Sequence, residues 1–130
     1  MKLNADRLDG QNAIARYGTA GVVVNGVEYR NSLVVPWRGG VHAWPVTLFE
    51  ALGEPHFALL AALEPELVIF GSGARLRFVR PALLRALIDL RIGIETMDTP
   101  AACRTYNVLL SEGRAVLAAL LFETGEGTAL

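Results

Sequence analysis

The sequence is poor in the residues from which most metal and nucleophilic sites are built. It holds one cysteine, Cys103, and two histidines, His42 and His56, in 130 residues. A single cysteine excludes an internal disulfide and leaves no cysteine cluster for zinc. Neither histidine has a second ligand at metal spacing, so we expect no metal and no cofactor. We expect Cys103 to be a packed, inert thiol, although a helix start can also lower a thiol pKa.

Long hydrophobic runs and a net charge are also missing. The longest apolar run, residues 115–122, is far shorter than the roughly 18 residues of a membrane helix. The first residues, 1–7, include one lysine but no apolar stretch behind it, which does not fit a secretory signal. The 13 acidic and 12 basic residues nearly cancel, so no global field attracts nucleic acid or an anionic membrane. We therefore expect a cytoplasmic protein with no nucleic-acid or membrane partner.

What the sequence does have is apolar residues, 52% of the total, arranged as two consecutive strand–helix–strand units. Helical crossovers join strands that lie parallel in one sheet, and a sheet covered on both faces has continuous apolar strands. The buried parallel centre is therefore predicted from three strands, at residues 67–70, 93–97 and 115–121. An apolar oligomer contact would also explain the high apolar fraction.

The N-terminal third reads as antiparallel strands. Asn25-Gly26 separates two β-prone runs within residues 22–29, and both residues tolerate the positive φ of a tight hairpin. A further strand is predicted from Ser32 to Pro36, where proline removes a ladder donor, and an earlier short one near Ile14–Tyr17. These strands would extend the central sheet or pack as a second one. Residues 37–53 show little pattern and predict a loop.

Three helices are predicted, each beginning at a proline that the first turn tolerates: Pro55, Pro81 and Pro100. Pro65 is expected to end the first helix, and Gly93 and Gly113 to cap the second and third. The fold class is α/β with a mixed sheet, central parallel βαβ units and an N-terminal β-hairpin region. We expect one domain over residues 1–122 and a frayed polar tail over residues 123–130.

Ligands of open α/β sheets bind beyond the carboxyl ends of the parallel strands. Two connections leave such ends here: Gly71-Ser72-Gly73, and residues 96–99 leading into the third helix. The glycine turn fits a backbone nest for an anion, or simply a tight turn; it matches no P-loop, dinucleotide fingerprint or nucleophile elbow. Asp98 and Thr99 fit either a helix cap, with Thr99 as N-cap, or a reactive pair.

Further along the third helix, Arg104 and Asn107 could face the same crevice.

Five arginines and one acidic residue fall within residues 75–91, which favours either a solvated charged face or a surface that binds the carboxylates of a partner. The arginines are Arg75, Arg77, Arg80, Arg85 and Arg91.

Several segments form a recognisable combination that covers about residues 12–122: Val68–Gly73, Gly93–Thr99, Ala102–Asn107, Leu109–Arg114, Val24–Gly26, Tyr29, Ser32–Pro36 and Trp44. Together they resemble a small α/β domain family of unassigned function. Its members include an assembly factor of mitochondrial respiratory complex I and an adipogenesis-associated domain protein.

The resemblance implies a three-layer domain around a mixed sheet and no established catalytic activity. Ser72 replaces the commoner threonine and keeps the hydroxyl. On this chain the family pattern singles out seven residues: Gly71, Gly73, Asp98, Thr99, Arg104, Tyr106 and Asn107.

Two functions follow as hypotheses. The first is a non-catalytic protein-binding or assembly module, with a protein partner or self-association, because no paired acid–base set stands out. The alternative is a protein that binds a small anionic metabolite, or an enzyme, using the crevice at the carboxyl ends of the parallel strands.

Overall fold

A computed structural model describes residues 10–123 and is built around one five-stranded sheet, in the order β5-β4-β8-β6-β7. Strand β6 runs parallel to both β7 and β8, and β4 pairs antiparallel with β8. This confirms the predicted mixed sheet with a parallel centre. The strand bounds are Leu33–Pro36 (β4), His42–Ala43 (β5), Leu67–Gly71 (β6), Gly93–Met97 (β7) and Val116–Leu120 (β8).

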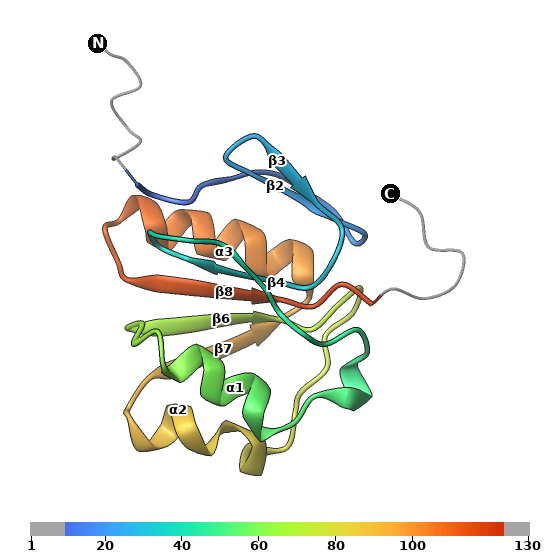
Figure 1. Ribbon diagram of the computed structural model, residues 1–130, viewed down its shortest axis with the longest axis vertical. Helices are drawn as coiled ribbons and strands as arrows, with labels where there is room; N and C mark the ends of the chain where they lie inside the picture. The colour runs from blue at the N-terminus through green and yellow to red at the C-terminus, as the bar shows by residue number, and fades with distance from the viewer. Residues whose placement is uncertain (1–9, 124–130) are drawn as a thin grey trace.

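Helices cover both faces of this sheet, giving the predicted three layers (Figure 1). Helix α3, Thr99–Ser111, lies on one face, and α1, Glu54–Ala61, and α2, Arg85–Asp89, lie on the other. All five residues of β8 are buried, because this central strand has neighbours on both sides and above and below. Its continuous apolar sequence is what a doubly covered strand requires.

A second, three-stranded antiparallel sheet lies on the α3 side and is separate from the central one. It consists of β1, Ile14–Tyr17, β2, Val22–Val24, and β3, Val27–Tyr29. Asn25 and Gly26 adopt φ of 51° and 84°, which confirms the predicted hairpin turn.

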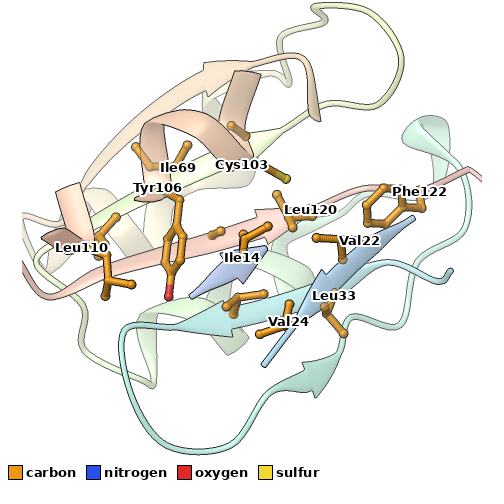
Figure 2. Packing of buried hydrophobic residues seen from close by; sticks show 14 residues of the cluster. Ile14, Val22, Val24, Leu33, Ile69, Cys103, Tyr106, Leu110, Leu120 and Phe122 are labelled. Atoms are coloured by element: carbon orange, nitrogen blue, oxygen red, sulfur yellow. The ribbon is translucent and has the colours of Figure 1, made fainter. Parts of the chain in front are cut away.

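The core divides into two parts, one on each face of the central sheet. The α3-side core joins α3 to the second sheet and to one face of β4, β6 and β8, as Figure 2 shows. The α1-side core contains Trp44, Phe57 and Phe70, which pack edge to face with ring centroids 5.6–5.9 Å apart. Such aromatic pairs stabilise beyond the area they bury.

Several predicted boundaries shift. Helix α1 ends at Ala61 and the chain reverses at Glu64, φ 54°, so the helix stops before Pro65 is reached. Pro81 begins a 3₁₀ turn, η2, Pro81–Leu84, which leads into α2. Gly93 does not cap α2: it is the first residue of β7, and Arg91, φ 59°, makes the turn.

The region predicted as loop contains short elements that periodicity does not reveal. Strand β5 pairs with β4, and a 3₁₀ turn, η1, spans Phe49–Ala51. Ile88 is exposed although it is apolar, because α2 is only five residues long and buries Leu87 alone.

Candidate functional site

The two connections predicted to share a crevice do meet, at the carboxyl ends of β6, β7 and β8. Thr99 N–H donates to the Gly73 carbonyl at 2.8 Å, and Gly73 N–H donates to Thr99 Oγ1 at 2.9 Å. Ser72 N–H donates to the Met97 carbonyl at 2.8 Å. The glycine turn and the start of α3 are therefore joined directly.

The residues of this junction are closely packed against each other. An added Cβ at Gly71 would lie 2.9 Å from both Cα and Oγ1 of Thr99, and 3.2 Å from Cβ of Ala102. Thr99 Oγ1 also donates to the Leu121 carbonyl at 2.9 Å, so this hydroxyl is both donor and acceptor. Ser72 and Thr99 have no exposed surface. Only glycine permits so close an approach of β6 to α3.

The Ser72 hydroxyl shapes the chain that follows it. It accepts a hydrogen bond from Arg77 N–H at 2.9 Å and lies 2.8 Å from the Arg75 carbonyl, to which it donates. These two bonds fix the bend at residues 73–75 and the start of the segment that follows it. Ser72 thus acts within the protein, in the way serine often stabilises turns.

Asp98, not Thr99, is the N-cap of α3, which corrects the predicted cap. Its carboxylate accepts from Ala101 N–H at 2.8 Å, and its backbone is extended. Thr99 is the first helical residue and directs its hydroxyl into the junction. A carboxylate at this position also interacts favourably with the helix dipole.

Tyr106 and Asn107 do not reach the junction; both hold the N-terminal segment against α3. Tyr106 donates to the Asn12 carbonyl at 2.7 Å and lies near Pro36, with its ring pointing from α3 toward β4 (Figure 2). The Asn107 amide bonds both backbone groups of Ile14, at 2.7 and 3.1 Å. Burial raises the pKa of Tyr106 above its ordinary value.

Arg104 is exposed and makes no hydrogen bond or ion pair with the residues described. The seven residues of the family pattern, together with Ser72, therefore divide into the junction, residues 71–73 with 98–99, and three side chains of α3 directed elsewhere. Ligand binding by this set stays a prediction. Open hollows of about 300 and 520 Å³ lie at other places, beside the β1–β2 turn and between α1 and α2.

Sequence reasoning missed a polar cluster centred on Arg77, next to the junction. Its Nη2 donates to the Ser72 carbonyl at 2.7 Å and to Glu123 Oε1 at 2.9 Å, and its guanidinium stacks 4.5 Å from the Phe49 ring centroid. Glu123 Oε2 accepts from Phe49 N–H at 2.8 Å. The partners are 46 and 74 residues apart in sequence, so no local pattern could indicate them.

Glu123 was assigned to the frayed tail, but this cluster holds it in place; residues 124–130 lie outside the described residues. Burial raises the pKa of its carboxyl, while the Phe49 N–H, the Arg77 guanidinium and the nearby Arg75 together hold it below its ordinary value. A lowered pKa means that this carboxylate stabilises the fold above the ordinary carboxyl range. That contribution is lost as pH falls through the folded-state pKa.

Glu123→Gln is therefore expected to lower the free energy of unfolding at pH 7 by about 1.5–3 kcal/mol, the range for hydrogen bonds to charged groups. The difference from the parent chain should shrink below the ordinary carboxyl range and vanish at lower pH. Urea unfolding followed by circular dichroism from pH 7 to pH 3 measures it. Glu95→Gln, at an exposed carboxyl, is the control. A difference that stays constant with pH contradicts the assignment.

Cys103 is the inert thiol that the sequence predicts. It is fully buried, and burial raises its pKa to about 12, despite an opposing effect of Arg104.

We expect iodoacetamide to modify Cys103 in the folded protein about a hundredfold more slowly than in urea, because the thiolate is the reactive form. Mass spectrometry follows the modification. Val108→Cys combined with Cys103→Ser places an exposed thiol on the same helix and should react rapidly in the folded state.

The two histidines differ in their surroundings. His56 Nδ1 accepts from Gly53 N–H at 3.0 Å at the start of α1, and His42 is exposed on β5. Among residues 10–123, no three His, Cys, Asp or Glu side chains are grouped so as to hold a metal ion. In the same residues, no helix has the length and apolar character needed to cross a bilayer.

Comparison with known proteins now gives the family. Residues 14–121 match a family described as "protein of unknown function (DUF498/DUF598)". The chain belongs to this family. The resemblance drawn from residues 12–122 is thereby confirmed.

One relative of this chain is named as an assembly factor. NADH dehydrogenase (ubiquinone) 1 alpha subcomplex assembly factor 3 of Bos taurus is 39% identical over 119 residues. The match covers 90% of this chain and 64% of that protein, so the chain spans less than two thirds of the relative's length.

Solved structures confirm the fold. A Bordetella parapertussis crystal structure, 34% identical, superposes with a TM-score of 0.83 and covers 90% of this chain and all of that one. A Bordetella pertussis protein described as a Mth938-like domain is 30% identical, with a TM-score of 0.78 and coverage of 95% and 93%. The DUF498/DUF598 domain is thus a Mth938-like α/β fold.

Proposed function

We propose that this DUF498/DUF598 domain is a non-catalytic module that binds another protein and takes part in assembling a complex. Its relative from Bos taurus is named an assembly factor, and the match spans nearly the whole of this chain. An assembly role requires a stable scaffold and an accessible surface, but no reacting group. A cytoplasmic location is part of the proposal.

The observation that carries the proposal is the contrast between the junction and the surface beside it. The Ser72 and Thr99 hydroxyls both form hydrogen bonds with other groups of the protein. A few residues on, Phe78 is 71% exposed, between the exposed arginines Arg75 and Arg80. Aromatic side chains and arginine are the residues enriched where proteins bind one another.

Site-specific photo-cross-linking in the cells that express the protein tests the proposal. Lysine occurs only at position 2, so amine-reactive reagents are of little use. Photoreactive residues at three exposed positions, 27, 78 and 108, sample different elements of the surface. We expect a covalent adduct of defined mass with one heterologous protein, which also co-purifies with the unmodified chain. A chain that gives no adduct from any position, and purifies alone, contradicts an assembly role.

A further inference from the structure

The segment between β6 and η2 pairs with no strand of residues 10–123, and its last residue, Arg80, is extended, with φ −65° and ψ 138°. In Figure 1 it crosses from the end of the sheet where β6 stops to the start of η2. Its side chains alternate over residues 76–80: Leu76, Phe78 and Arg80 are exposed, whereas Arg77 and Val79 are partly buried. Alternation with a period of two is the pattern of an extended chain with one face on a core.

The backbone of this segment is largely unpaired. Arg77 N–H donates to Ser72 Oγ, and the Arg80 carbonyl accepts from Leu83 N–H. Leu76, Phe78 and Val79 make no backbone hydrogen bond to any residue in the described range 10–123. Exposed, extended N–H and C=O groups are a template for pairing with another chain.

The inner face of the segment fixes it to the domain at two points. Arg77 bonds the Ser72 carbonyl and Glu123, and Val79 packs against the α1-side core. A segment held at two points loses little conformational freedom when a partner binds, which favours affinity.

The charge on the outer face is positive. Arg77 is neutralised by Glu123, but Arg75 and Arg80 are exposed and form no ion pair with the part of the chain that the structure describes. The next arginine, Arg85, is also exposed and unpaired there. Exposed arginines present forked donors that suit carboxylates.

We propose that residues 75–80, the docking segment, bind an extended acidic segment of a partner protein by β-strand addition. The partner's backbone pairs with the free groups around Phe78, its carboxylates meet Arg75 and Arg80, and its apolar side chains cover Leu76 and Phe78. Main-chain pairing with alternating side-chain recognition is an established mode of peptide binding. The inference rests on the proposed function and names the surface and the chemistry of the partner.

A designed peptide tests the docking segment directly. The probe is acetyl-Asp-Val-Glu-Ile-Asp-Val-amide, titrated into the full chain labelled with ¹⁵N; a peptide with lysine at the three acidic positions is its counterpart. Amide shifts are expected at residues 75–80, with the acidic peptide bound at least about tenfold more tightly than the basic one. Arg80→Glu should weaken acidic binding about tenfold, whereas Arg38→Glu, at an exposed loop arginine, should not.

Peptide N-methylation separates strand addition from charge attraction alone. In a strand, the backbone N–H groups of every second residue point toward a given neighbouring strand. Methylation of the peptide amides that point toward the docking segment should therefore abolish binding. Methylation of the intervening amides should leave binding unchanged. Phe78→Ser should weaken the acidic peptide, with Val108→Ser as the matched control at an exposed apolar residue. Equal tolerance of both methylation patterns, shifts outside the segment, or no preference for acid overturns the inference.

Two further outcomes separate this inference from the proposed function. Photo-adducts with a heterologous partner from positions 27 or 108 but none from 78 leave the assembly role intact and remove the docking segment. Shifts at residues 75–80 that depend on protein concentration without peptide identify a second copy as the occupant, which also overturns the acidic-partner proposal.

Discussion

Gly71→Ala is expected to destabilise the domain by about 3 kcal/mol or more, the upper range for forcing extra volume into a packed core. The new methyl group would lie 2.9 Å from the Cα and the Oγ1 of Thr99. Neither atom can move away freely. The Thr99 backbone bonds Gly73, its hydroxyl bonds Leu121, and the Gly71 carbonyl itself accepts from Leu121 N–H at 3.0 Å. Relief of the clash therefore requires the start of α3 to separate from three strand ends.

Urea unfolding monitored by circular dichroism measures this effect, with soluble yield as a second readout if the variant does not fold. Gly18→Ala is the matched control, because an added Cβ there meets nothing within 4 Å and the residue does not need positive φ. This control should be neutral or slightly stabilising, since alanine reduces the freedom of the unfolded chain. Equal stability of the two variants would show that the junction is looser than the structure has it.

The sequence predicts those parts of the fold that local chemistry determines. Asn25-Gly26 specifies its hairpin because few residue pairs tolerate two consecutive positive φ values. The parallel arrangement of β6, β7 and β8 follows from the helices between them and needs no tertiary information. The meeting of the glycine turn with the start of α3 follows from the same rule.

What the sequence could not supply is which polar atoms face each other across the fold. Tyr106 and Asn107 share a helix with Thr99, yet they bind Asn12 and Ile14, residues more than 90 positions away. Arg77 belongs to an arginine-rich run that suggests a uniform charged face. Only the fold shows that Arg77 forms the ion pair with Glu123, while Arg75 and Arg80 stay exposed. Periodicity identifies the face of an element but not its partner.

The family pattern acquires a structural meaning at this junction. Gly71, Gly73, Asp98 and Thr99 were candidates for a ligand site because they lie beyond the strand ends. In the fold, Gly71 gives α3 room to approach, Gly73 has the positive φ, 107°, that its turn requires, and Asp98 caps the helix. The Thr99 hydroxyl joins the turn after β6 to Leu121, which follows β8. These roles alone account for the presence of each residue type.

Thr99→Val should accordingly be among the most damaging conservative changes in the chain. Valine keeps the volume but removes the hydroxyl, so the Leu121 carbonyl and the Gly73 N–H both lose their bonds in a fully buried place. Each unsatisfied buried group costs about 1–3 kcal/mol, which predicts a loss of roughly 3 kcal/mol in the free energy of unfolding. Thr99→Ser keeps both bonds and loses one methyl group, so it should cost only about 1 kcal/mol. The two variants, compared by denaturant unfolding at the same pH, isolate the hydroxyl. If valine is tolerated as well as serine, helix α3 is held to the strand ends by apolar packing, and the hydrogen bonds of Thr99 are not what fixes its start.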